Sequence, residues 1–414
     1  MTDRRPSRRE FLKATAAVAG APYAITSAAL GGPGGTPAGD RIGLGFIGVG
    51  GMGSGHLSSF LGRRECRVLA VADVDARHRD RARQRVERAY GTGKGVLFTG
   101  DFRELIARED IDGVVTALPD HWHAIPAIMA MKAGKDVYGE KPLSLTVREG
   151  RAMLDAARRY GRVFQTGSQT RSNGSVRHVC ELVLNGRIGK VKEIYVNCGG
   201  PPRPCRLPAE AVPDYLDWEM WVGPGPMRPY HHGLHPYSWR SYREYSGGQI
   251  ANFGAHRFDL AQWALGMDDS GPVEVRPAGG GRPLTYVYAD GTRMYRRPGP
   301  HGGQVHFVGT EGELRIGPNA SWPPHIIRQA IGPGQKHLYR SGDHRGDWLR
   351  CMRTRRRPVA DVAVGYRTVT ICHIGSIATF LGRALKWDPS AEDFVGDPEA
   401  SRRLARPKRA PWRT

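Results

Sequence analysis

The sequence predicts an α/β fold with a doubly wound parallel sheet in its first half, followed by a second domain. Residues 42–49 form a short apolar run that leads into the glycine-rich turn GVGGMG. A second apolar run at residues 68–72 ends at Asp73, an acid twenty residues past Gly53. From there to residue 166, short apolar runs alternate with helix-like segments, which is typical of a parallel sheet with helices on both faces. With 414 residues and 40% hydrophobic content, the chain is long enough for two domains.

Each predicted strand is a nearly continuous apolar run, because a parallel strand is covered on both faces. The strands are predicted at residues 42–49, 68–72, 96–99, 112–118, 136–138 and 162–166. Between them, helices are predicted at residues 54–61, 75–90, 102–107, 124–133 and 146–160. Ligands of such sheets bind outside the carboxyl ends of the strands. The polar residues that follow these runs are therefore the first candidates for a site.

The turn after the first strand fits the G-x-G-x-x-G pattern with Gly48, Gly50 and Gly53. The first glycine permits a tight turn, the second lets the backbone approach a pyrophosphate, and the third lets helix and strand pack closely. The N–H groups of the next helix, including that of Met52, then face the phosphates. In a chain with 55 glycines the pattern alone could be a turn that binds nothing. The flanking strands and Asp73 favour a dinucleotide site in a Rossmann domain.

Asp73 bears on which dinucleotide binds. A carboxylate at the end of the second strand accepts hydrogen bonds from ribose hydroxyls and repels a 2′-phosphate. We therefore expect NAD rather than NADP. Arg77 and Arg79 lie nearby in the sequence and favour the opposite choice.

Two further strand ends carry polar residues that should converge on the same crevice. Pro119, His121 and His123 follow the strand at residues 112–118, and Glu140 and Lys141 follow the strand at residues 136–138. We expect all five to contribute to the cofactor site. A lysine at such an edge is either an ordinary surface residue or an ammonium that stabilises a developing alkoxide.

The N-terminus has the pattern of a twin-arginine export signal. Residues 1–30 contain Arg8 and Arg9 in the stretch SRREFLK, followed by a mild apolar segment that closes on small residues. That segment is too short to be a stable membrane anchor. Residues 31–40, rich in glycine and proline, form a linker. We expect the twin-arginine export machinery to carry the folded protein, with its cofactor tightly held, into the periplasm or another extracytoplasmic space.

Charge and cysteine content limit the alternatives. The net charge is +21, but the positive residues are scattered and no nucleic-acid-binding motif is present, so nucleic acid is not an expected partner. Of the six cysteines only Cys198 and Cys205 are close in sequence. A disulfide between them is possible in an oxidising space, although buried free thiols are the default expectation.

Four motifs together resemble the Gfo/Idh/MocA oxidoreductase family. They are GVGGMG, PDHWHA (119–124), YGEKPL (138–143) and SGGQIANFGAHRFDLAQWALG (246–266), and the resemblance spans residues 41–383. It implies an NAD-binding Rossmann domain at residues 41–168. A substrate and oligomerisation domain at 169–387 would follow, an α+β domain with a large, mostly antiparallel open sheet, which often forms a homodimer or homotetramer. The tail at 388–414 is similar to that of an exported branch of the family.

The resemblance also implies catalytic roles. Lys141 corresponds to the family's catalytic lysine, and His256 to its proton acceptor. Many relatives carry an aspartate one turn before that histidine, where this chain has Asn252. On one continuous helix Asn252 would lie on the same face as His256. An amide there supplies a hydrogen bond without the charge that raises a histidine pKa.

Substrate contacts are predicted at Arg171, Arg240 and Asp259. The segment around residues 199–237 is rich in proline, glycine and tryptophan, and so long a loop is uncommon unless it is functional. Its aromatic side chains could stack on sugar rings or pack the loop onto the body. The spacing of His231, His232 and His235 fits no common ligand pattern, so no metal is expected.

Three functions remain in view. The first is an exported NAD(P)-dependent oxidoreductase that transfers hydride between a tightly held nicotinamide and a hydroxyl of a sugar, polyol or glycoside. The second is an NAD-dependent glycoside hydrolase that oxidises a ring carbon, eliminates the aglycone and reduces again. The third, supported by the departure at Asn252, is a binder without catalytic activity.

Overall fold

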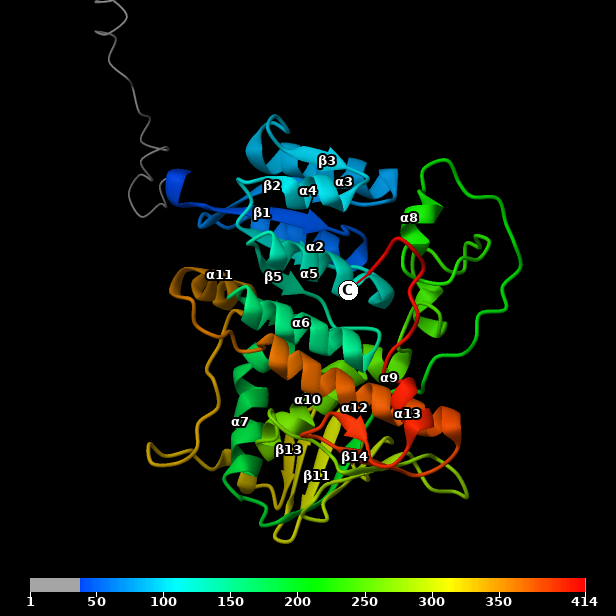
Figure 1. Ribbon diagram of the computed structural model, residues 1–414. Helices are drawn as coiled ribbons and strands as arrows, with labels where there is room; N and C mark the ends of the chain where they lie inside the picture. Colours follow the sequence, from blue (N-terminus) through cyan, green and yellow to red (C-terminus); the bar gives the residue numbers. More distant parts are fainter. Residues whose placement is uncertain (1–37, 414) are drawn as a thin grey trace, which may run out of the picture.

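The computed structural model describes residues 38–413 (Figure 1). The predicted export signal and most of the linker lie outside these residues. No helix in the described part of the chain is long and apolar enough to cross a bilayer.

The first half folds around a sheet of six strands in the order β3-β2-β1-β4-β5-β6, and every neighbouring pair is parallel. The strands are β1 (Ile42–Ile47), β2 (Cys66–Ala72), β3 (Leu97–Thr99), β4 (Gly113–Thr116), β5 (Asp136–Gly139) and β6 (Phe164–Thr166). The helices that connect them are α2 (Gly51–Leu61), α3 (Ala76–Tyr90), α4 (Phe102–Ala107), α5 (Ala124–Lys132) and α6 (Val147–Arg159). The predicted doubly wound parallel sheet is confirmed.

The second half contains a sheet of nine strands in the order β13-β12-β11-β7-β10-β9-β8-β14-β15. Every neighbouring pair is antiparallel except β7 and β10. The strands are β7 (Val191–Val196), β8 (Glu274–Arg276), β9 (Thr285–Val287), β10 (Arg293–Tyr295), β11 (Val305–Gly309), β12 (Glu313–Ile316), β13 (Ala320–Trp322), β14 (Leu385–Asp388) and β15 (Asp393–Phe394). The expected large, mostly antiparallel sheet is therefore present.

Helices fill the space between the two sheets, where Figure 1 shows α6, α10 and α12. The helices of the second half are α7 (Gly174–Leu184), α8 (Trp218–Val222), α9 (Gln249–Asn252), α10 (Gly254–Leu265), α11 (His344–Thr354), α12 (Val362–Leu381) and α13 (Pro398–Arg402). The short 3-10 helices are η1 (Ala38–Asp40), η2 (Asp120–Trp122), η3 (Gln169–Ser172), η4 (Ser238–Ser241) and η5 (Ile326–Arg328). One apolar core runs from α5 and α6 through α12 into the nine-stranded sheet, so the two halves share a buried interface.

Asn252 and His256 do not lie on one continuous helix, because the helix is interrupted at Phe253 and divided into α9 and α10. Helix α11 follows β13 of the second sheet in the chain, but it packs against the first sheet. Its Trp348 and Met352 join a core with Leu44 and Phe60, and they lie against Gly113 on β4. The contact is made by residues more than two hundred positions apart, which no local pattern reveals.

A buried ion pair ties η3 to α10. The guanidinium of Arg171 is 2% exposed and donates to both oxygens of Asp259, at 2.8–3.0 Å, and to Asp268 at 2.6–2.9 Å. Thr368 on α12 also donates to Asp259, at 3.1 Å. Two carboxylates thus satisfy one buried cation, the Thr368 hydroxyl donates to one of them, and the network fixes three elements.

Removal of this cation should destabilise the fold. We expect Arg171→Ala to lower the free energy of unfolding by about 3–5 kcal/mol, since it leaves Asp259 charged, buried and unpaired. Urea denaturation followed by circular dichroism measures the change. The matched control is Arg276→Ala, which removes an exposed arginine paired with Glu274 and should cost no more than about 1 kcal/mol. Equal losses in the two variants would contradict a structural role for the buried pair.

Candidate active site

A pocket lies at the carboxyl ends of β1, β2, β4 and β5, where the long segment of residues 199–245 faces the sheet. The site residues predicted from the sequence that line it are Gly48, Gly50, Met52, Asp73, Pro119, Glu140, Lys141, Arg240 and Asn252. The structure therefore brings together the glycine turn, the acid after β2 and the lysine after β5. This convergence is the one that the parallel sheet predicts.

The glycine turn has the close packing that a dinucleotide site needs. Gly48 has φ of +81°, and a Cβ on it would lie 2.5 Å from the carbonyl oxygen of Ala117. A Cβ on Gly53 would lie 2.0 Å from the carbonyl oxygen of Gly48. The N-cap of α2, Gly50, has no side-chain cap, so the first N–H groups of the helix remain available to an anion. These features fit a pyrophosphate at this turn.

Asp73 is anchored but retains acceptor capacity. Its carboxylate accepts the N–H of Val49 at 2.8 Å and that of Asp75 at 2.9 Å, and it contacts Nδ1 of His78 at 3.2 Å. A carboxylate offers about four acceptor positions, so one remains for a ribose hydroxyl. Asp73 lines the pocket, which suits the role that its position in the sequence predicts.

The two arginines that favoured NADP are both engaged elsewhere. Arg77 donates to Asp75 at 2.9–3.2 Å, and its guanidinium lies 3.3 Å from the ring centre of Tyr215. Arg79 donates to the backbone oxygen of Asp73 at 2.5 Å. Neither guanidinium lines the pocket.

Lys141 contacts the second domain through Asn252. Its ammonium donates to the side-chain oxygen of Asn252 at 2.8 Å and to the backbone oxygen of the same residue at 3.2 Å. Burial lowers the pKa of Lys141, while the charges of Glu140 and Asp120 oppose that shift. The ammonium is therefore positioned in the pocket by a neutral amide rather than by a carboxylate.

Glu140 is held behind Lys141 by a buried network. Nε2 of His56 lies 2.8 Å from its carboxylate, and Gln169 donates to it at 2.7 Å. Arg345 in turn donates to Nδ1 of His56 at 2.9 Å, which sets the histidine tautomer with the proton on Nε2. Burial alone would raise the pKa of Glu140, but the hydrogen bond from His56 and the charge of Lys141 outweigh it and lower the pKa to about 2. Glu140 is thus a fixed anion beside Lys141.

His256 lies on α10, close enough to Lys141 for the two charges to interact. Burial, followed by the charge of Lys141, lowers the pKa of His256 to about 4. Its Nδ1 atom is buried and has no hydrogen-bond partner among the described residues. The ring is therefore neutral at physiological pH, with an unused nitrogen. The side chain of Asn252 bonds Lys141 and Gln249.

His121 and His123 do not line the pocket. Nε2 of His121 lies 3.0 Å from the backbone oxygen of Trp221, and burial lowers its pKa to about 4. His123 bridges the backbone oxygens of Leu118 and Pro142. The two rings thus join the polar strand ends to each other and to residues 199–245, and they position the pocket without facing it.

The three predicted substrate residues separate in the structure. Arg240 lines the pocket, 4.4 Å from the ring centre of Trp239. Arg171 and Asp259 are buried in their ion pair outside the pocket, so the structure does not bring them to the substrate.

The histidines of residues 199–245 also separate. His231 and His232 contact Glu210 at 3.2 and 2.8 Å on the surface, whereas His235 lies 3.0 Å from the buried Asp75. Each group has three possible metal ligands. In the group of Glu210, His231 and His232, the N–H of Gly233 donates to Nδ1 of His231. The ring proton of His231 is therefore on Nε2, the atom that faces Glu210, and not free to be replaced by a metal without loss of that contact.

Sequence reasoning missed His78 and His235 as residues of the pocket. Asp120 of the segment after β4 and two aromatic residues of the long segment, Trp221 and Tyr237, also line it. The second acid of the D-V-D sequence after β2 was the available signal, because Asp75 is the partner of His235.

Comparison with known proteins supports the family that the sequence motifs resemble. Residues 42–168 match the family model described as the NAD-binding Rossmann fold of an oxidoreductase family, and residues 204–414 match the model of its C-terminal alpha/beta domain. The chain belongs to the Gfo/Idh/MocA oxidoreductase family.

The individual relatives are more distant. A glycosyl hydrolase family 109 protein of Shewanella pealeana is 38% identical over 123 residues, 29% of this chain and 27% of that protein. The match thus spans about a quarter of the relative. Two solved structures share the fold, each covering 84% of this chain and 99% of the other: myo-inositol 2-dehydrogenase from Lactobacillus plantarum (TM-score 0.59, 20% identity) and aldose-aldose oxidoreductase from Caulobacter crescentus (TM-score 0.58, 18% identity).

The geometry predicts how Lys141 controls the protonation of His256. In Lys141→Met the positive neighbour is removed, so the imidazolium becomes easier to form and the pKa of His256 should rise from about 4. It should stay below the ordinary value because burial remains. NMR titration of the histidine rings measures the shift. Arg257→Met is the control, since the charge of Arg257 lowers this pKa less. An unchanged pKa in the lysine variant would refute the coupling.

Proposed function

We propose that this protein is an NAD-dependent oxidoreductase acting on a hydroxyl of a sugar, polyol or glycoside. The observation that carries the proposal is that Lys141 lines the same pocket as a glycine turn that fits a dinucleotide, with the neutral His256 close enough to Lys141 to feel its charge. A bound nicotinamide supplies the hydride acceptor. NAD rather than NADP is supported by Asp73 and by the engagement of Arg77 with Asp75.

The residues of the site have different roles in the proposed oxidation of an alcohol. His256 takes the hydroxyl proton, because its ring is neutral and can accept one. Lys141 stabilises the negative charge that develops on the substrate oxygen, and the amide of Asn252 holds the ammonium in place. A nicotinamide bound at the glycine turn would accept the hydride from the same carbon, so the alcohol would become a carbonyl. Arg240, on the same wall, is positioned to bind an oxygen of the substrate or a phosphate.

A second candidate function is a glycosidase that oxidises its substrate transiently. The similarity to a glycosyl hydrolase family 109 protein over 123 residues supports it. In this cycle the ring carbonyl acidifies the neighbouring C–H bond, the aglycone leaves by elimination, water adds, and the hydride returns. No net NADH is formed. Aryl glycosides and free polyols distinguish the two: aglycone release without NADH indicates the glycosidase, and NADH formation or coupled reduction indicates the oxidoreductase.

The proposal predicts that the purified protein contains NAD, identified by mass spectrometry of the released nucleotide. A protein that binds no nucleotide in calorimetry would overturn the proposal.

The role of Lys141 has a separate test. Lys141→Ala should keep the fold and the nucleotide but lose turnover by about 10²–10³-fold, as when one positioned electrostatic group is removed. Wild-type turnover in this variant would show that Lys141 has no catalytic role.

Export is part of the proposal and has its own test. Replacement of Arg8 and Arg9 by lysine should leave unprocessed precursor in the cytoplasm, because the paired arginines are the feature by which the twin-arginine pathway selects its cargo. Cell fractionation followed by immunoblotting measures the distribution. Export of the variant at the wild-type level would show that residues 1–30 are not a twin-arginine signal. We also propose a homodimer or homotetramer, which sedimentation analysis checks.

A further inference from the structure

Residues 199–245, here called the cover segment, leave the nine-stranded sheet after β7 and lie against the first domain (Figure 1). They meet the turn that follows β2. The N–H of Ala76 donates to the oxygen of Tyr215 at 2.8 Å, and the N–H of Asp217 donates to the oxygen of Val74 at 3.1 Å. Leu216 and Asp75 form an antiparallel bridge. The second domain thus adds backbone hydrogen bonds to the edge where the cofactor acid, Asp73, is located.

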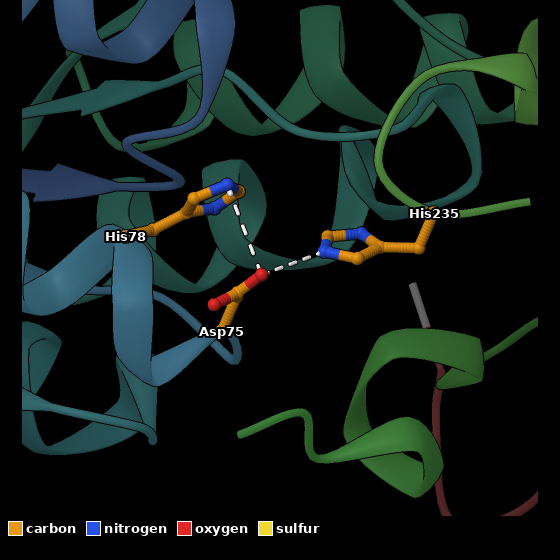
Figure 2. Close-up of side chains that lie close together, drawn as sticks. All are labelled: Asp75, His78 and His235. Atoms are coloured by element: carbon orange, nitrogen blue, oxygen red, sulfur yellow. Dashed lines mark hydrogen bonds and ion pairs between the residues drawn. The ribbon is translucent and has the colours of Figure 1, made fainter. Parts of the chain in front are cut away.

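Asp75 is the centre of this contact. Its side chain is fully buried, and Figure 2 shows His235 of the cover segment and His78 of α3 on either side of it. Nε2 of His235 lies 3.0 Å from the carboxylate, and Nε2 of His78 lies 3.8 Å away. Burial alone would raise the pKa of Asp75, but the hydrogen bonds from His235 and Arg77 outweigh it and hold the pKa far below its usual range. The charged carboxylate therefore stabilises the docked position.

The same three side chains could hold a metal ion, since their ligand atoms lie within 4.8 Å of one another. The hydrogen bonds favour another explanation. One oxygen of Asp75 accepts the backbone N–H and Nε of Arg77, and the other accepts Nη2 of Arg77 and Nε2 of His235. These four bonds use the acceptor capacity of the carboxylate, and Arg77 balances its charge. The cluster is a satisfied contact between domains.

The residues that follow His235 form a wall of the cofactor pocket. Pro236, Tyr237 and Trp239 line it, and the ring of Tyr237 lies 3.6 Å from the position of a Cβ on Gly51 in the glycine turn. With the cover segment docked, the pocket has a volume of about 190 Å³, less than the 300–1,000 Å³ of ordinary small-molecule sites. A dinucleotide bound at the glycine turn would therefore lie against this wall.

We propose that the cover segment is a closure whose contact between Asp75 and His235 retains the dinucleotide through repeated turnovers. The proposal rests on the proposed function, because it concerns the same pocket. His235 is a positioning residue: it acts through Asp75, at the Asp73 end of the pocket, and takes no part in hydride transfer. Retention then follows from the domain contact, in addition to the affinity of the glycine turn.

The test measures release of the nucleotide rather than activity. The full-length protein is loaded with the fluorescent analogue etheno-NAD, an excess of NAD is added, and release is followed by fluorescence. His235→Ala should release the analogue about 10- to 100-fold faster, the range for loss of a buried hydrogen bond to a charged group. His235→Gln, which keeps an N–H donor, should restore part of the retention. Asp75→Asn combined with His235→Ala should release no faster than the quicker of the two single variants, because both break one contact.

The matched control is Glu210→Gln, which removes the charge of a carboxylate that contacts His231 and His232 in the same segment but away from Asp75. Glu210→Gln should release the analogue at the wild-type rate.

If His235→Ala does not fold, Tyr215→Ala loosens the same docking site through the stacked Arg77 and should also accelerate release. Wild-type release in a folded His235→Ala, or equal acceleration in the control, overturns the proposal. So does a stoichiometric metal whose chelation speeds release. Failure of the wild-type protein to bind any NAD would instead be failure of the proposed function.

Discussion

The contact between Lys141 and Asn252 is the interaction on which the candidate site depends. The lysine follows β5 of the first domain, and the amide ends α9 of the second, so the ammonium is in place only when the domains are docked. The shared core through α6 and α12 supplies the apolar surface that maintains this docking. Behind the lysine, Arg345 and His56 fix Glu140 as an anion. The geometry of the candidate site therefore depends on the contact between the two domains.

The electrostatics of the site follow from this arrangement. An aspartate at position 252 would pair with the ammonium at 2.8 Å and favour its charged form. With asparagine at this position, only the charges of Glu140 and Asp120 oppose the lowering of the Lys141 pKa by burial. The ammonium is then free of a tight ion pair, so a developing alkoxide meets less competition for it. The same charge, together with burial, keeps His256 neutral. The departure from the family pattern is thus compatible with catalysis.

The features that could be predicted from the sequence are those that depend on local patterns. Apolar runs, glycine spacing and the acid after β2 predicted the parallel sheet and placed Gly48, Asp73 and Lys141 at one edge, because strand ends in such a sheet must coincide. The break at Phe253 was missed, since the spacing of Asn252 and His256 fits a continuous helix equally well. Arg171 and Asp259 were assigned to the substrate because a charge pattern does not show its partners. The contact of Asp75 with His235 joins residues 160 positions apart, in a segment without periodicity.

Retention of the cofactor restricts the chemistry that the pocket can sustain. If the nucleotide leaves slowly, the hydride taken from one hydroxyl has to be returned within the same pocket before a second cycle begins. Two outcomes satisfy this condition: return to the same substrate after elimination, as in a redox-neutral glycosidase, or transfer to a second carbonyl substrate. A dehydrogenase that exchanges free NADH at every turnover does not. The docking of residues 199–245 at Asp75 therefore bears on the reaction class as well as on affinity, because it acts at the step where these mechanisms differ.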